Sequence, residues 1–74
     1  MTKDLSVLSF KMLGYQINIS ELFDNPSSSE PTRIKITAEN EEYWFIKYYR
    51  YNADKNQLLE KFKQFIISEE KKLI

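Results

Sequence analysis

The chain has 74 residues with eleven basic and eleven acidic side chains, and a formal charge of zero argues against a protein that holds duplex nucleic acid mainly by neutralising phosphates. It contains no cysteine, which excludes disulfides, thiolate zinc sites and cysteine nucleophiles, and no histidine, which removes the commonest general base and metal ligand. At this length we expect one domain, residues 1–74, with no cofactor and a small core.

Residues 8–19 alternate between apolar and polar side chains on both sides of Gly14, the only glycine. The alternation slips at the glycine and then resumes, which predicts two antiparallel strands joined by a turn. The alternative is a short helix from Asp4 to Leu13 that Gly14 would cap at its C-terminus. We favour the hairpin. The next segment, residues 20–25 (SELFDN), is a candidate for one helical turn opened by its serine.

Residues 24–32 (DNPSSSEPT) hold two prolines and three serines, a composition typical of a loop. Residues 33–37 then alternate between polar and apolar side chains. Residues 38–42 supply a polar turn in which Asn40 can take a left-handed conformation. Together with the aromatic segment that follows, this pattern predicts a second hairpin.

In the C-terminal segment, apolar residues recur three or four positions apart, which predicts an amphipathic helix over about residues 55–71. Asp54 followed by Gln57 resembles a capping box, and Asn52 is the alternative cap. The apolar stripe is assigned to the core. The apolar residues left over form a candidate docking edge or dimer contact: Ile67, Leu73 and Ile74.

These elements predict an α+β fold, a small antiparallel β-sheet of two hairpins in β-β-β-β-α order, with one C-terminal amphipathic helix packed on one face. The longest apolar runs, such as residues 65–67, are far too short to span a bilayer or to form a signal-peptide core. Since cysteine is also missing, we expect a soluble, cytoplasmic protein with no membrane partner.

Residues 42–51 (EYWFIKYYRY) hold six of the chain's eleven aromatic residues, on both faces of any extended strand. The length of the preceding turn decides which of them face the core, because a slip of one residue moves every side chain to the other face. An odd number of turn residues would put Ile34 and Ile36 on one face with Trp44, Ile46 and Tyr48. An even number would put them with Tyr43, Phe45, Tyr49 and Tyr51, and leave on the other face Arg33, Lys35, Trp44, Ile46, Tyr48 and Arg50.

We prefer the odd turn, because it leaves Arg50 as the only charged residue of this segment on the core-facing side. The candidate binding face then consists of Arg33, Lys35, Tyr43, Phe45, Lys47, Tyr49 and Tyr51. An ordinary structural role also fits these residues, since aromatic pairs stabilise small sheets and cations protect sheet edges. As a function, we expect a small non-enzymatic protein-interaction module, an inhibitor or regulator that docks this face on a larger protein.

Two other functions fit the same face. One is binding of single-stranded nucleic acid, whose bases stack on aromatic side chains beside cations. The other is a homodimeric structural domain that buries its second sheet face against a second copy.

Catalytic and metal-binding groups are not evident in the sequence. Glu39, Glu41 and Glu42 cluster in a predicted turn, where a solvated turn explains them better than a loose divalent-cation site. The serines of residues 27–29 have no base in register, so we assign them no nucleophilic role. We therefore expect no catalytic residue, no metal ligand and no enzymatic activity.

Overall fold

The computed structural model describes residues 3–25, 27 and 29–73, and within them it contains one antiparallel four-stranded sheet followed by a single helix. The predicted α+β class and β-β-β-β-α order are therefore confirmed. The elements are β1 (Lys3–Met12), β2 (Tyr15–Phe23), β3 (Arg33–Glu39), β4 (Trp44–Arg50) and α1 (Lys55–Lys72).

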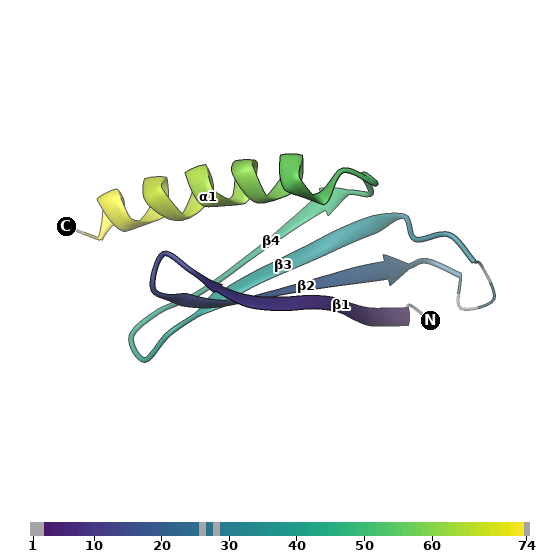
Figure 1. Ribbon diagram of the computed structural model, residues 1–74, viewed down its shortest axis with the longest axis horizontal. Helices are drawn as coiled ribbons and strands as arrows, with labels where there is room; N and C mark the ends of the chain where they lie inside the picture. Colours follow the sequence, from purple (N-terminus) through teal and green to yellow (C-terminus); the bar gives the residue numbers. More distant parts are fainter. Residues whose placement is uncertain (1–2, 26, 28, 74) are drawn as a thin grey trace.

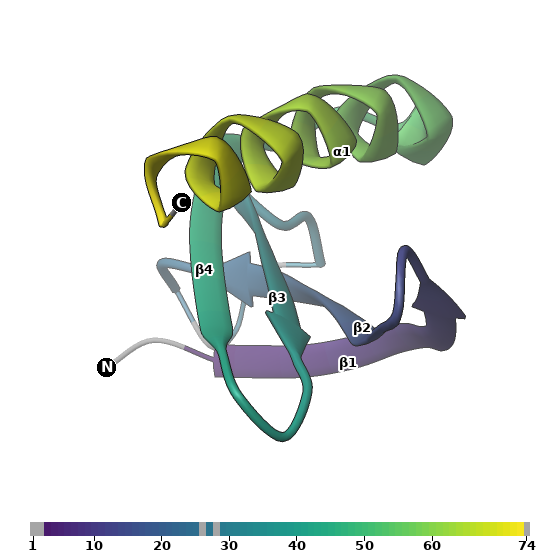
Figure 2. The same cartoon turned by 90° about the vertical axis from the view of Figure 1, so that its left-hand side faces the viewer.

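The strands form a meander in the order β1-β2-β3-β4, so β1 and β4 are its two edges. The helix covers one face of the twisted sheet (Figure 1). The view turned by 90° shows that α1 passes over β4 and β3, whereas β1 lies farthest from it (Figure 2). We call the face turned away from α1 the open face.

The first hairpin turns at Leu13 and Gly14, whose φ angles are 55° and 81°. A turn with two positive φ angles matches the right-handed twist of the flanking strands. Positive φ angles favour glycine, because glycine has no β-carbon. The hairpin prediction is confirmed, and the alternative helix over residues 4–13 is wrong. The candidate helical turn at residues 20–25 is also wrong, because residues 20–23 extend β2: residues 20–22 pair with both β1 and β3, and residue 23 pairs with β1.

A bulge interrupts the pairing of β1 with β2. Ser6 lies opposite Ser20 and Leu8 lies opposite Ile19, so Val7 is an extra residue on β1. The bulge moves the side-chain alternation of β1 by one position. As a result, Leu8 lies on the helix side of the sheet, the same side as Leu5 before the bulge.

The predicted helix is confirmed over residues 55–72, and both predicted caps take part in its start. The Asp54 carboxylate accepts a hydrogen bond of 3.3 Å from the backbone N–H of Gln57. Asn52 makes the return contacts: its Oδ1 accepts from the Asp54 N–H at 2.9 Å, and its Nδ2 donates to Gln57 Oε1 at 2.8 Å. The cap is therefore shared by three side chains.

The core lies between α1 and the two central strands. Its residues alternate along the strands and recur three or four apart on the helix, as the periodicity predicted. The buried members are Tyr15, Ile17, Ile19, Ile34, Ile36, Ala38, Leu58, Phe62 and Ile66. Of the apolar residues left over at the helix end, Ile67 is half-buried and Leu73 exposed, and Ile74 lies outside the described residues.

The described residues of the predicted loop at 24–32 form turns and bends rather than a helix or strand, and Pro26 and Ser28 of that segment lie outside the description. Its end is fixed by the sheet. The Thr32 N–H donates to the Leu22 carbonyl at 2.8 Å, and the Tyr51 N–H donates to the Thr32 carbonyl at 3.0 Å. The loop therefore returns the chain to the edge of β2.

Candidate functional site

The turn before β4 has four residues, 40–43, which sets the register of the aromatic strand. Asn40 closes it: its side-chain oxygen accepts hydrogen bonds from the N–H groups of Glu42 at 2.8 Å and Tyr43 at 2.7 Å. The predicted turn at 38–42 begins two residues before the observed turn and ends one residue before it. Asn40 also stays outside the left-handed region, because its side chain rather than a positive φ makes the turn.

The preferred odd register is therefore wrong. Ile36 lies opposite Lys47, and Ile34 lies opposite Tyr49, so the isoleucines share their face with Phe45, Lys47 and Tyr49. The reason given for the odd register also fails. Lys47 lies on the helix side but at the sheet edge, where it stays exposed and its ammonium lies 5.2 Å from the ring centre of Phe65. A lysine can pack its stem there and keep its charge in water.

The seven residues of the predicted binding face consequently do not form one surface. Arg33 and Lys35 lie on the open face, whereas Phe45, Lys47 and Tyr49 lie on the helix side. Tyr43, in the turn, stacks on Phe45 with ring centres 6.3 Å apart. Tyr51 follows β4, and the Lys55 ammonium lies 6.0 Å from its ring centre.

The aromatic residues on the helix side close the core. Phe45 packs edge to face against Tyr15 at 5.6 Å and against Phe65 at 6.3 Å. Tyr49 is half-buried against the core, and burial raises the pKa of its phenol. These side chains are used in packing, so they are poor candidates for recognition of a partner.

The other side of β4 carries the exposed aromatic residues. Trp44 and Tyr48 are 58% and 50% exposed, among the highest values for large apolar residues of the described chain. The Arg33 guanidinium lies 6.0 Å from the Tyr48 ring centre. We define the aromatic surface as the open-face residues at this edge: Arg33, Trp44, Ile46, Tyr48 and Arg50. They belong to the set that the even turn predicted.

Most of the rest of the open face is polar, and several of its side chains pair with one another. Ser9 donates a hydrogen bond of 2.8 Å to Asn18 Oδ1, and Gln16 Nε2 donates one of 2.7 Å to Ser9 Oγ. Lys35 on β3 forms an ion pair with Asp4 on β1. This part is an ordinary solvated sheet surface, so the exposed aromatic residues on this face are confined to the β4 edge.

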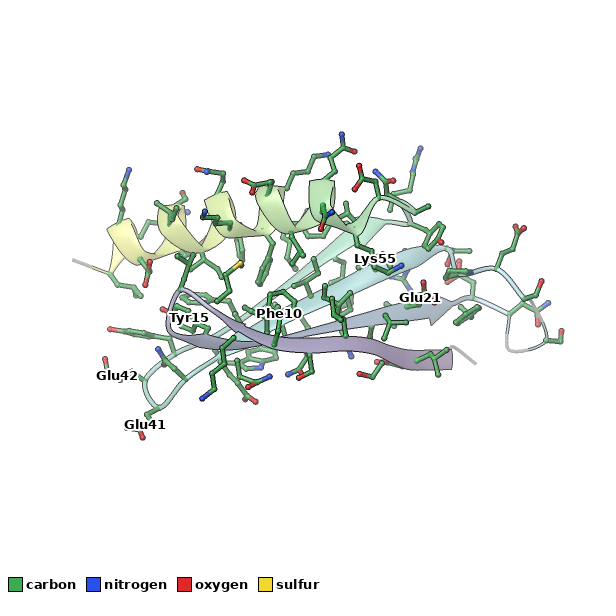
Figure 3. All side chains as sticks on the ribbon, viewed as in Figure 1. Phe10, Tyr15, Glu21, Glu41, Glu42 and Lys55 are labelled. Atoms are coloured by element: carbon green, nitrogen blue, oxygen red, sulfur yellow. The ribbon has the colours of Figure 1, made fainter. Side chains whose placement is uncertain are left out.

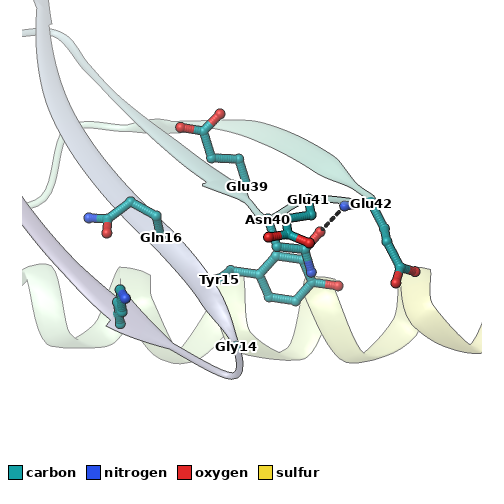
Figure 4. Close-up of a pocket in the computed structure, with 8 residues that line it drawn as sticks. Gly14, Tyr15, Gln16, Glu39, Asn40, Glu41 and Glu42 are labelled. Atoms are coloured by element: carbon teal, nitrogen blue, oxygen red, sulfur yellow. Dashed lines mark hydrogen bonds between the residues drawn. The ribbon is translucent and has the colours of Figure 1, made fainter.

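A broad pocket of about 700 Å³ lies between the tips of the two hairpins (Figure 4). Glu39, Glu41 and Glu42 line it, together with Tyr15. Figure 4 shows Glu39 and Glu42 pointing in different directions. Within the described residues, no group of three or more histidine, cysteine, aspartate or glutamate side chains could hold a metal ion. The Tyr15 phenol is already used, since it donates to Glu70 at 3.0 Å.

Sequence reasoning chose the wrong turn length and therefore did not select the open-face residues of β4, which are Trp44, Ile46, Tyr48 and Arg50. The signal that could have found them is Asn40. An asparagine whose side chain accepts from the N–H groups two and three positions later favours a closed turn of four residues here.

Comparison of the chain with models of known protein families, with curated proteins and with solved structures finds no match. Among the described residues, no helix is both long enough and apolar enough to cross a membrane.

Proposed function

We propose that the protein is a small non-enzymatic binding module that docks its aromatic surface on a larger protein, as an inhibitor or regulator. The observation that carries this proposal is the exposure of Trp44 and Tyr48 on one face of an edge strand. Tryptophan, tyrosine and arginine are the residues most enriched at the energetic centres of protein interfaces. A partner that covers these exposed aromatic rings removes apolar surface from water, which makes the free energy of binding more favourable.

The charges around the surface favour a protein partner over nucleic acid. Two of the nearby cations already have acidic partners: Arg33 lies 3.5 Å from Asp24, and Lys35 pairs with Asp4. Phosphate binding depends on cations that displace counterions from the nucleic acid. With a formal charge of zero for the whole chain, single-stranded nucleic acid is the weaker candidate.

The absence of enzymatic activity is part of the proposal. Catalysis by nucleophilic attack needs a hydroxyl or thiol within hydrogen-bond reach of a base. Among the described residues, the serine side chains hydrogen-bond to Asn18, Gln16 and Asn25, none of which is a base. The Tyr15 hydroxyl does contact the Glu70 carboxylate, but Tyr15 is buried at 3% exposure. We therefore expect broad hydrolase and nuclease screens, with and without divalent cations, to read background. Turnover that a single carboxylate substitution abolishes would contradict this.

The test compares the loss of an aromatic ring at two neighbouring positions. Trp44→Ser removes the most exposed ring of the aromatic surface, and Tyr43→Ser removes an exposed ring that packs on the helix side. Wild-type protein and both variants are used for affinity capture from a native lysate, with and without nuclease. We expect Trp44→Ser to weaken capture of a protein at least about tenfold, with an unchanged melting temperature, and Tyr43→Ser to have little effect.

Once a partner is isolated, fluorescence of Trp44 can report its burial directly, since it is the only tryptophan in the chain. Its fluorescence should shift to shorter wavelength when the partner covers the ring. Capture that nuclease abolishes would identify a nucleic-acid ligand instead. Capture that neither Trp44→Ser nor Tyr48→Ser weakens would contradict the proposed surface.

A further inference from the structure

The free edge of β1 carries exposed apolar residues and no charge along its middle. Leu5, Val7 and Leu8 are 46%, 42% and 45% exposed. From Leu5 to Phe10 the sequence LSVLSF contains no charged residue. Natural edge strands usually carry lysine, proline or inward-pointing charge, because a bare edge offers unpaired backbone groups to another strand. The middle of β1 has none of these.

The helix does not cover this edge. Leu5, Leu8 and Phe10 lie on the helix side of the sheet, yet α1 passes over the opposite edge (Figure 2). Figure 3 shows Phe10 between β1 and α1, and this ring is half-buried against the core. The apolar groups of the core therefore continue to the surface along β1.

We infer that a second copy of the chain pairs with this edge, β1 against β1, antiparallel about a two-fold axis between Val7 and Leu8. This register follows from the sequence of β1, which is self-complementary when it is reversed. The opposed residues are Asp4 with Lys11, Leu5 with Phe10, Ser6 with Ser9, and Val7 with Leu8. Each apolar residue meets an apolar one, each serine meets a serine, and each charge meets its opposite.

The bulge at Val7 makes this register geometrically consistent. Opposed residues of an antiparallel pair must point to the same face and direct their backbone groups toward each other. In a regular strand these properties alternate, so an axis between two neighbouring residues would oppose side chains of different faces. The bulge shifts the alternation by one. Its effect is visible in the pairing with β2, where Asp4, Ser6, Ser9 and Lys11 all share the open face.

Charge complementarity supports the same register. Lys11 is exposed, and no described residue forms an ion pair with it. In the dimer its ammonium would lie beside Asp4 of the second copy, on the open face, where Asp4 already contacts Lys35. The pairing from Asp4 to Lys11 would extend over about 24 Å at the usual rise of a strand.

The other sheet edge is less suited to self-pairing. β4 has seven residues with Lys47 at its centre. An antiparallel pair that used the whole strand would place Lys47 directly opposite its own copy, and like charges in that position destabilise a ladder. β1 is longer, at ten residues, and carries its charges only near its two ends. Self-pairing of β1 therefore places no like charges opposite each other at its centre.

The dimer leaves the proposed binding site free. Its continuous sheet would have β4 at each outer end, so it would present two copies of the aromatic surface to one partner or two. Two linked sites can bind far more tightly than one when a partner spans both. This inference does not depend on the proposed function, because the contact that forms the dimer lies on the opposite edge of the sheet.

The first test is the mass in solution of wild-type protein and two leucine variants, by sedimentation over a range of concentrations. Wild type should approach twice the chain mass of 8.9 kDa as concentration rises. Leu8→Lys places a lysine beside the two-fold axis twice, so we expect its dimer dissociation constant to rise at least about a hundredfold. Leu13→Lys is the matched control, since Leu13 is 44% exposed but lies in the turn beyond the paired residues.

The second test uses the ion pair across the axis. Lys11→Glu opposes two carboxylates and Asp4→Lys opposes two ammonium groups, so each variant alone should dimerise about tenfold more weakly. An equal mixture of the two restores both opposite-charge pairs and should reform a dimer. Circular dichroism establishes that each variant is folded, and Trp44→Ser should remain dimeric.

Three results would overturn the inference. The first is a wild-type protein that stays monomeric at every concentration reached. The second is a dimer that Leu8→Lys leaves intact while Trp44→Ser dissociates it, which would place the contact at β4. The third is a mixture of the charge variants that associates no better than either variant alone.

Discussion

The Tyr15 phenol donates a hydrogen bond of 3.0 Å to Glu70 Oε2, although the two residues are 55 positions apart in the sequence. This bond joins the start of β2 to the last turns of α1. At the other end of the helix, the Lys55 ammonium lies 3.4 Å from a Glu21 carboxylate oxygen (Figure 3). The helix is thus tied to the central strand β2 at both ends.

The Tyr15 contact should make stability fall at alkaline pH. Burial raises the pKa of Tyr15 above its usual value of about 10, and the hydrogen bond to Glu70 and the charge of Glu70 raise it further. A raised folded-state pKa contributes stability below about pH 10 that is lost as pH rises through the folded value. Tyr15→Phe should cost about 1 kcal/mol at neutral pH but show a shallower decline above about pH 10. Urea unfolding across this range measures both effects, and equal slopes would contradict the assignment.

Phe62 is the largest fully buried side chain, at 0% exposure, and it lies on the face of α1 that meets the sheet. Phe62→Ala should therefore destabilise the protein by about 3 kcal/mol or more, a large part of the total for a domain of this size. Lys61→Ala, on the exposed side of the same turn, is the control and should change the free energy of unfolding by less than about 0.5 kcal/mol. Similar small effects from both would mean that the helix does not pack as described.

Tyr48 and Tyr49 are neighbours that test the register of β4. Tyr49 lies opposite Ile34 and packs against the core, whereas Tyr48 lies opposite Lys35 on the open face. Replacing either by serine loses the same strand propensity, so the difference between the variants reports burial. We expect Tyr49→Ser to cost about 1 to 2 kcal/mol more than Tyr48→Ser, measured by thermal or urea unfolding. The reverse order would restore the odd register.

The order of the four strands and the helix could be predicted from the sequence, because the strand and helix periodicities and one helix cap were locally complete. Gly14 marked a turn between two alternating runs, and the Asp54 and Gln57 spacing marked the helix start. Residues 20–23 were harder. Their local pattern favours a helical turn, but the backbone of a central strand gains hydrogen bonds on both sides, which outweighs a weak local preference.

The candidate site could not be predicted with the same success, because it depends on the number of turn residues between β3 and β4. One residue more or less between β3 and β4 exchanges Trp44 and Tyr48 for Phe45 and Tyr49 on the open face. The odd number of turn residues was preferred because it leaves Arg50 as the only charged residue on the core-facing side, whereas the observed register puts Lys47 there. At a sheet edge a lysine can face that side, since the ammonium of Lys47 reaches the surface beside the Phe65 ring.

The turn of the first hairpin offers a stabilising change. Leu13 has φ of 55°, a left-handed conformation that costs a residue with a β-carbon about 1 to 2 kcal/mol and costs asparagine less. Leu13 is exposed, so Leu13→Asn loses little burial and should stabilise the protein by about 1 kcal/mol, or raise the melting temperature by about 4 to 8 °C.

Gly14→Ala, at the next position of the same turn, should destabilise the protein. Gly14 has φ of 81° and no atom within 4 Å of an added β-carbon, so its cost of about 1 kcal/mol would come from the backbone alone. Thermal unfolding at a fixed protein concentration measures both changes. A neutral Gly14→Ala would mean that the turn adopts a different conformation in solution.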